Sequence, residues 1–245
     1  MLTKATAKLI RELHDKKGRQ EHGLFLVEGE KNVLELLDSN FEIQQLFVTA
    51  DFEKEHKALV EAKPHLVVEQ EELEKIGTLE SNNAALAVVK QKENLSLSVE
   101  KNEIVLALDD VRDPGNLGTI IRIADWYGIT KIICSPTTTD FYNPKTISAT
   151  KGSFTRVNIF YTDLTEYLKN VSVPVFGAFL GGESVHTMQF PAEGILVMGS
   201  ESHGIGEKLS ELIKNKITIP AYGKAESLNV SIATAIILDN WKRGK

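Results

Sequence analysis

The chain has 245 residues, 42% hydrophobic and 25% charged, and its 28 Lys and Arg against 34 Asp and Glu give a net charge of −6. This composition is that of an ordinary globular protein with one large domain or two modest ones. The acidic balance argues against a nonspecific nucleic-acid binder, which usually carries a basic excess. There is no run of about 18 apolar residues to span a membrane, and residues 1–20 lack the apolar core of a secretory signal. We therefore expect a cytoplasmic protein without membrane association.

Cysteine and histidine usage gives no sign of a disulfide framework or a metal centre. Cys134 is the single cysteine, which fits a reducing compartment. The six histidines show no HxxxH spacing and no CxxC pair occurs, so no metal site is expected.

Positive charge is concentrated at the start of the chain. Within residues 1–20 only Glu12 and Asp15 oppose six basic side chains, which are Lys4, Lys8, Arg11, Lys16, Lys17 and Arg19. Such an arm could bind phosphate groups, but a solvated helix face explains the pattern equally well.

The first part of the chain alternates short apolar runs with helical patterns. In order we predict helix 2–14, strand 24–29, helix 31–39, strand 43–49, helix 52–62, strand 65–69, helix 71–76 and strand 85–91. These elements predict a small α/β domain over residues 1–98. The charged stretch 92–102 loses the periodicity and indicates a linker, with a boundary near 95–102.

A larger α/β domain is predicted over residues 103–245. Its first strand, 103–111, is almost continuously apolar, which is typical of a buried parallel sheet. The further expected elements are helix 116–127, strand 131–135, a short helix within 143–152, strand 157–161, helix 164–170, strands within 173–181 and 195–202, and a last strand, loop and helix. Because ligands of such sheets collect beyond the carboxyl ends of strands, a site is expected at the turns after Leu108, Phe179, Met198 and Ile219.

The turn after the first of these strands is followed by the sequence DPGNLGTIIR (113–122). Asp113, Pro114 and Gly115 favour a turn, and Asn116 stands where a helix is predicted to begin, a favoured capping position. Arg122 lies six residues further on and, taken alone, is most simply a solubilising side chain.

A second turn, GSESHGIGEKL (199–209), places Glu201 among glycines that allow tight backbone geometry. The stretch matches neither GxGxxG nor GxxxxGK[ST], and no GxSxG occurs elsewhere. Dehydrogenase, P-loop and hydrolase interpretations therefore lose their usual support.

The third stretch runs from Ile217 to Trp241, where a strand breaks at Pro220, crosses a polar loop and enters an apolar helix. Ser227 and Asn229 stand where that helix is predicted to begin, and Ser is a favoured N-cap. A capped apolar helix without chemistry explains this stretch, taken alone, equally well.

Together and in this order, DPGNLGTIIR (113–122), VMGSESHGIG (197–206) and IPAYGKAESLNVSIATAI (219–236) resemble the three motifs of the SpoU (TrmH-type) RNA ribose methyltransferases of the SPOUT superfamily. The resemblance covers residues 103–245, and residues 20–92 resemble the small substrate-binding domain of many members. It implies an α/β catalytic domain with a trefoil knot, an exception to the rule that chains do not thread loops, preceded by a small α/β RNA-binding domain. It also implies a homodimer with its two sites near the subunit interface.

The resemblance also implies which residues form the site. The family's motif residues correspond to Asn116, Arg122, Glu201, Ser227 and Asn229. The donor S-adenosyl-L-methionine would lie against Gly199, Ile219 and Leu228, flanked by backbone of Phe179, Leu180, Gly181, Ser200 and Pro220. The family proposal has Arg122 accept the hydroxyl proton, but a guanidinium has a pKa above about 12 and stays charged. Binding substrate phosphate and orienting the hydroxyl is the chemically simpler role.

The implied activity is methyl transfer from S-adenosyl-L-methionine to a ribose 2′-hydroxyl of RNA, with rRNA favoured over tRNA because of the added domain. The alternatives are a tRNA 2′-O-methyltransferase and a noncatalytic RNA-binding or ribosome-assembly protein on the same scaffold.

Overall fold

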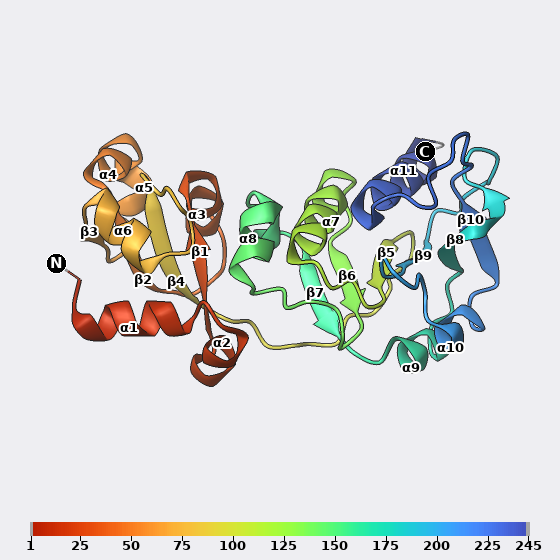
Figure 1. Ribbon diagram of the computed structural model, residues 1–245, viewed down its shortest axis with the longest axis horizontal. Helices are drawn as coiled ribbons and strands as arrows, with labels where there is room; N and C mark the ends of the chain where they lie inside the picture. The colour runs from red at the N-terminus through yellow and green to blue at the C-terminus, as the bar shows by residue number, and fades with distance from the viewer. Residues whose placement is uncertain (1, 244–245) are drawn as a thin grey trace. The chain divides into compact units, whose positions relative to one another are not determined.

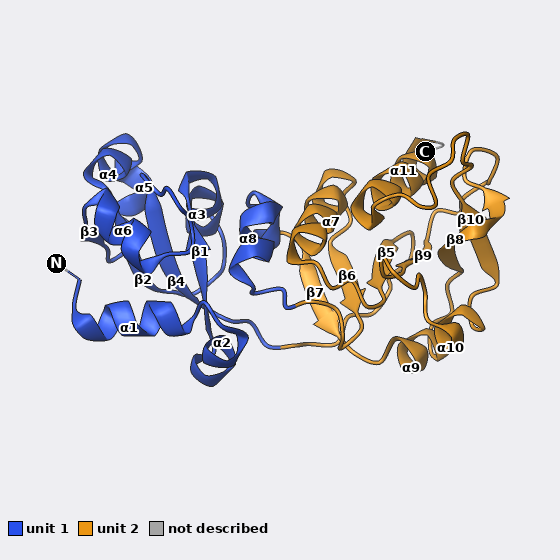
Figure 2. Ribbon diagram, in the orientation of Figure 1, with its two compact units in different colours: residues 1–93, 140–155 blue, residues 94–139, 156–245 orange. Residues whose placement is uncertain are grey.

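Two units make up the chain in the computed structural model, which describes residues 2–243 (Figure 1). Unit 1 contains residues 1–93 and 140–155, and unit 2 contains residues 94–139 and 156–245 (Figure 2). Within residues 2–243, no helix combines the length and apolar character needed to cross a membrane.

Unit 1 is built on a four-stranded sheet of order β1-β4-β2-β3, in which β4 runs antiparallel to both its neighbours and β3 pairs parallel to β2. Its elements are α1 (Lys4–Glu12), α2 (Lys16–His22), β1 (Leu24–Glu28), α3 (Glu30–Leu37), β2 (Ile43–Val48), α4 (Ala50–Glu55), α5 (Lys57–Val60), β3 (Leu66–Val67), α6 (Gln70–Ile76), β4 (Ala85–Lys90), α8 (Pro144–Thr150) and the 3₁₀ turn η1 (Ser153–Thr155).

The basic N-terminal segment is folded into this unit. Helix α1 begins at the Thr3 cap, whose hydroxyl accepts a hydrogen bond from the Thr6 amide at 3.1 Å. Ile10 and Leu13 are buried in the same core cluster as Leu73 of α6. Apolar burial therefore orders the segment, and the cations of α1, Lys4, Lys8 and Arg11, lie exposed on the opposite face.

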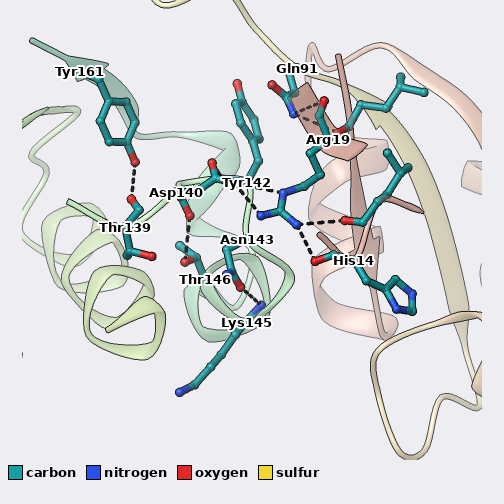
Figure 3. Close-up of polar contacts among 12 residues, drawn as sticks. His14, Arg19, Gln91, Thr139, Asp140, Tyr142, Asn143, Lys145, Thr146 and Tyr161 are labelled. Carbon is teal, nitrogen blue, oxygen red and sulfur yellow. Dashed lines mark hydrogen bonds and ion pairs between the residues drawn. The ribbon is translucent and has the colours of Figure 1, made fainter. Parts of the chain in front are cut away.

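Arg19 does not belong to that exposed basic face. Its guanidinium is buried, with 2% of the side chain exposed, and it donates to Asp140 Oδ2 at 2.7 Å (Figure 3). It also donates to the backbone carbonyls of Leu13 at 3.0 Å and His14 at 2.7 Å. A buried charge needs such a set of partners, so Arg19 connects the end of α1 to residue 140, far along the chain.

An aromatic cluster explains why residues 140–155 pack with unit 1. The ring of Phe25 lies 4.6 Å from that of Tyr142 and 6.4 Å from that of Phe154. Phe154 also contacts Phe41 at 5.7 Å between ring centroids. The compact units therefore differ from the predicted sequence domains 1–98 and 103–245, since residues 140–155 pack with the first unit. The terminal residues 1, 244 and 245 of the predicted spans lie outside the described residues.

Two other differences from the predicted elements have local causes. Helix α2 was not predicted, because its sequence KKGRQEH contains no apolar residue that could show a period. It ends at Gly23, whose φ of 64° is the left-handed conformation that glycine adopts readily. The single helix predicted over 52–62 is two short helices, α4 and α5, separated at His56.

Unit 2 contains a six-stranded sheet of order β10-β8-β9-β5-β6-β7, and all of its strand pairs are parallel. Its elements are β5 (Ile104–Leu108), α7 (Pro114–Trp126), β6 (Lys131–Cys134), β7 (Asn158–Tyr161), α9 (Leu164–Lys169), β8 (Val175–Ser184), β9 (Gly194–Met198), α10 (Glu207–Ser210), β10 (Asn215–Thr218) and α11 (Val230–Arg243). The predicted parallel sheet is confirmed.

Helices cover both faces of this sheet, as its apolar central strands require. In Figure 1, α7 and α11 lie on one side of the sheet and α9 and α10 on the other. Val105 and Ala107 of β5 pack in one cluster with Leu164 of α9 and Leu209 of α10. Cys134, at the end of β6, is fully buried, and burial raises the pKa of its thiol far above the ordinary value, so this cysteine is a core residue as predicted.

The Arg19 ion pair gives a stability prediction. Substituting Arg19→Ala leaves Asp140, 18% exposed, without its main partner, and breaking a buried pair in this way costs about 3–5 kcal/mol. We expect a corresponding fall in the free energy of unfolding measured with urea. Lys17→Ala, which breaks the exposed pair with Glu21, is the matched control and should cost less than about 1 kcal/mol. Equal effects of the two substitutions would contradict the assignment.

Candidate active site

The carboxyl ends of the parallel strands β5, β9 and β10 lie at one edge of the unit 2 sheet, and all three sequence motifs follow these strands. The loop 109–113 leads from β5 into α7, the turn 199–206 follows β9, and the loop 219–229 leads from β10 into α11. This is the edge at which ligands of open α/β sheets bind.

The turn after β9 is held by its own backbone. Ser200 and Gly204 exchange two backbone hydrogen bonds of 2.9 and 3.0 Å, and Gly204 has a φ of 67°. A Cβ at position 199 would lie 2.1 Å from the carbonyl carbon of Gly204, so only glycine fits there. The Gly206 amide donates to Asp109 Oδ2 at 2.8 Å, which connects the turn to the end of β5. As a result, Glu201 is presented to solvent from a constrained turn.

A chain of side-chain hydrogen bonds joins the three motifs. The Asn116 amide nitrogen donates to Glu201 Oε1, and its amide oxygen accepts from Asn229 Nδ2 at 2.9 Å. Asn229 Oδ1 in turn accepts from the Ser231 amide at 3.0 Å and from the Ser231 hydroxyl at 2.6 Å. The structure therefore brings Asn116 together with Glu201 and Asn229, which lie 85 and 113 residues further along the chain.

The helix caps differ from those predicted. Helix α7 is capped by Asp113, whose carboxylate accepts from the Asn116 amide at 2.8 Å, with Pro114 in the first turn. Asn116 is thus inside the helix, and its side chain is available for the bonds to Glu201 and Asn229. Helix α11 is capped by Asn229 and not by Ser227, because the helix begins at Val230, later than the sequence pattern indicated.

An irregularity in β8 brings further residues to this edge. Gly177 pairs with Lys216 and Glu183 with Ile217, so residues 178–182 loop out between two successive partners on β10. The loop returns at Gly182, where a Cβ would lie 2.4 Å from the Lys216 carbonyl oxygen. Phe179 and Leu180 occupy this excursion and line the cleft described next.

A cleft of about 910 Å³ opens between these loops within unit 2. It is lined by Phe179, Leu180, Gly199, Ser200, Ile219, Pro220 and Leu228 among the residues predicted to hold the donor, and by Glu201 and Ser227 among the predicted catalytic residues. Gly181, which also belongs to the β8 excursion, does not line the cleft. Asn116 and Asn229 are not lining residues either. Asn116 is connected to the cleft by its bond to Glu201, and Asn229 by its bond to Asn116.

Arg122 is a further predicted site residue that does not line the cleft. It is exposed on α7, and it is not among the residues that line the cleft. Arg122 lies six positions after Asn116 on α7, so it projects from a different face of the helix than Asn116. Its predicted contact with phosphate remains a prediction.

Several residues of the site are not predicted by the sequence motifs. The lining residues not predicted are Ala178, Met198, Ser202, His203, Gly204, Ile205, Ile217, Thr218, Ala221, Tyr222, Gly223, Ala225, Glu226, Val230, Ala233 and Ile237. Val230, Ala233 and Ile237 follow the i, i+3, i+7 spacing of one helix face, which could have indicated them. Most of the other lining residues lie in loops, and loop sequences have no periodicity from which the position of a side chain could be predicted.

Close to the motif loops, an ion pair orders the chain between β5 and α7. Arg112 Nε donates to Asp110 Oδ1 at 2.9 Å, and this hydrogen bond is the main reason why the pKa of Asp110 lies below its ordinary value. Asp110 has a φ of 59°, a left-handed conformation that Asp tolerates better than most residues. The Asp110 amide also donates to the Ser135 hydroxyl at 2.9 Å, which connects this loop to the end of β6.

Comparison with known proteins identifies the family. Residues 103–239 match the SpoU rRNA Methylase family, and residues 4–87 match the MRM3-like substrate binding domain. The first match covers more than half of the chain, so the protein belongs to the SpoU rRNA methylase family, as its three motifs predicted.

Individual relatives share most of their length with the chain. It is 31% identical over 232 residues to the 23S rRNA (guanosine(2553)-2′-O)-methyltransferase RlmP of Bacillus subtilis, a match that covers 93% of this chain and 92% of the relative. A TrmH-family structure from Porphyromonas gingivalis has 34% identity and a TM-score of 0.88, with 100% of both chains covered. An AdoMet-bound rRNA methyltransferase from Sinorhizobium meliloti has 32% identity and a TM-score of 0.88, with 100% of this chain and 96% of that chain covered.

The double role of Asn229 can be separated by substitution. Asn229→Ala removes both the cap of α11 and the bond to Asn116, and we expect a loss of about 1 kcal/mol in the free energy of unfolding. Asn229→Asp keeps an oxygen that can cap the helix but removes the donor to Asn116, and it should stay within about 0.5 kcal/mol of the parent. Urea unfolding of both variants checks this. Destabilisation of the Asp variant to the level of the Ala variant would show that the cap is not what stabilises α11.

Proposed function

We propose that this protein transfers a methyl group from S-adenosyl-L-methionine to a ribose 2′-hydroxyl of RNA, with ribosomal RNA as its substrate. The main structural support is the hydrogen-bonded set of Asn116, Glu201 and Asn229, which joins the three family motifs at the edge of one cleft. The relatives support the same conclusion, because RlmP of Bacillus subtilis is named as a 23S rRNA 2′-O-methyltransferase.

The cleft fits the proposed methyl donor. Its volume of about 910 Å³ lies within the range of small-molecule and cofactor sites, about 300–1,000 Å³. Ile219, Leu228 and Leu180 offer apolar surface for a purine ring, and the backbone of the 199–204 turn lies in the same wall. The related structure from Sinorhizobium meliloti is AdoMet-bound. When bound, S-adenosyl-L-methionine supplies an electrophilic methyl group.

The protein's own residues then have to position a weak nucleophile. A ribose hydroxyl attacks poorly near neutral pH, so most of the rate enhancement comes from orientation. Glu201 is held by Asn116 at the cleft wall, and Ser227 lines the same wall from the loop before α11. We assign these side chains to positioning the ribose and the donor-binding loops. The guanidinium of Arg122 binds RNA phosphate.

Two alternatives keep the same scaffold. A tRNA 2′-O-methyltransferase would use the same cleft. RlmP, which matches 93% of this chain, is named for 23S rRNA, and this favours rRNA over tRNA. A noncatalytic RNA-binding or ribosome-assembly protein would have no need for the intact Asn116, Glu201 and Asn229 set, so we favour the enzyme.

Substitution of Arg122 distinguishes the methyltransferase from the noncatalytic RNA-binding protein. Arg122→Ala should leave S-adenosyl-L-methionine binding, measured by calorimetry, unchanged, because Arg122 does not line the cleft. Methylation of RNA from a strain lacking the gene should fall at least about 10²-fold, since the phosphate contact that orients the substrate is lost. If the variant kept the biological function of the gene without methylating RNA, the protein would be a noncatalytic RNA-binding or ribosome-assembly protein and not an enzyme. The proposal as a whole fails if the parent protein neither binds the donor nor methylates that RNA.

We also propose that the protein works as a homodimer through the face formed by α7 and α11. Trp126 on α7 is 84% exposed, and Ile232 on α11 is an exposed large apolar residue. Exposed apolar groups of this size often mark association surfaces. Arg122 lies one helical turn before Trp126, so this association would bring it to a subunit interface.

The dimer prediction has a direct test. Trp126→Glu places a charge in the proposed interface, and sedimentation equilibrium should show a shift from dimer to monomer. The control is Leu95→Glu, at an exposed apolar residue in the linker, which should leave the dimer intact. A substitution of Trp241 would not serve as the control, because Trp241 is buried. A parent protein that is monomeric at micromolar concentration would refute the dimer.

We also propose that unit 2 contains the deep trefoil knot that the family implies. The chain passes from β7 at one edge to β8, returns to β9 beside β5, and then crosses to β10 outside β8. Pulling the termini apart in a single-molecule experiment should give an extended length shorter than about 3.3–3.6 Å per residue, because a tightened knot retains chain. A full-length extension would exclude the knot.

A further inference from the structure

One aromatic side chain at the mouth of the cleft has no role in the assignments above. Tyr222, in the loop between β10 and α11, is 92% exposed and lines the cleft. Leu180, 84% exposed, and Leu228, 49% exposed, line the same cleft. The fold therefore places three large side chains at one opening, and none of them contributes to the core.

Tyr222 carries the open six-membered aromatic ring of this cleft. Phe179, the other lining residue with a six-membered ring, is partly buried and has the Lys216 ammonium 4.9 Å from its centroid. The smaller imidazole of the exposed His203 also lines the cleft, and its Nδ1 is hydrogen-bonded to the Ser202 hydroxyl at 2.7 Å. Gly223 follows Tyr222, and residues 221–229 are all exposed, so both faces of the Tyr222 ring can be approached.

The chemistry proposed for this cleft requires such a surface. A ribose hydroxyl can reach a donor inside a cleft only when its nucleotide leaves the stack of an RNA helix, and an unstacked base regains stability on an aromatic side chain. Removing an aromatic ring on which one base stacks lowers the affinity of a protein for the nucleic acid by about 5- to 150-fold.

We propose that Tyr222 stacks on a base of the substrate RNA and positions the nucleotide whose ribose is methylated. The inference rests on the proposed function and names a substrate-positioning residue for it. The loop carries one exposed cation, Lys224, and one exposed anion, Glu226, so its charge is balanced and does not attract phosphate. The contribution of Tyr222 is accordingly a stacking contribution, insensitive to salt.

The experiment compares Tyr222→Ala with Tyr222→Phe, which keeps the ring and removes only the hydroxyl. Filter binding to an unmodified 23S rRNA transcript is measured over a range of salt concentrations, and calorimetry with S-adenosylhomocysteine measures cofactor binding. Methyl incorporation gives KM for RNA and kcat. Leu95→Ala, which removes an exposed apolar side chain away from the cleft, is the control.

For Tyr222→Ala we expect weaker RNA binding by about 5- to 150-fold. We expect a raised KM for RNA, an unchanged slope of log affinity against log salt, and unchanged S-adenosylhomocysteine affinity. Tyr222→Phe and Leu95→Ala should behave as the parent protein.

Three results would overturn the assignment. Unchanged RNA affinity in Tyr222→Ala would exclude stacking. An equal loss of S-adenosylhomocysteine affinity would mean that the ring covers the cofactor, and a change in sedimentation would mean that it contacts a second copy. A failure of the proposed function would look different, because the parent protein itself would then neither bind S-adenosylhomocysteine nor methylate the transcript.

Discussion

The side-chain amide of Asn116 connects segments that leave three different strands. It lies on the first turns of α7 after β5, donates to Glu201 on the turn after β9, and accepts from Asn229 at the start of α11. Since an amide offers donors and an acceptor at once, one residue type can satisfy both neighbours. Aspartate in its place would lose the donor and leave two carboxylates facing each other.

That arrangement in turn depends on the parallel sheet. Parallel strands bring their carboxyl ends to one edge, and β5, β9 and β10 do so here although they are separated by long stretches of chain. Each loop is then anchored locally, the β9 turn by Gly199 and by Asp109, and the last loop by the Asn229 cap. The polar frame is therefore built on rigid elements, which is what a positioning mechanism requires.

The sequence predicted the parts of this site that reflect periodicity and motif order, and missed those that depend on tertiary contact. The parallel sheet and the family followed from apolar runs and from three motifs in sequence. The caps were misplaced at Asn116 and Ser227, because a polar residue near a helix start satisfies the capping pattern at several neighbouring positions. The β8 excursion could not be predicted, since it depends on the register between β8 and β10. Arg122 was grouped with the site by motif, whereas helix geometry turns it away from the cleft.

The aromatic cluster of Phe25, Phe41, Tyr142 and Phe154 bears on how this architecture can be inherited. Unit 1 is discontinuous in sequence, because Tyr142 and Phe154 lie between β6 and β7 of the other unit. A gene segment for residues 1–98 would encode a core that lacks two of its rings, and a segment for residues 103–245 would carry those rings without the surface they cover. Exchange of the N-terminal unit between relatives thus requires matched change in a loop some fifty residues beyond the apparent boundary. The packing of unit 1 thus constrains a segment that the sequence pattern assigns to the other domain.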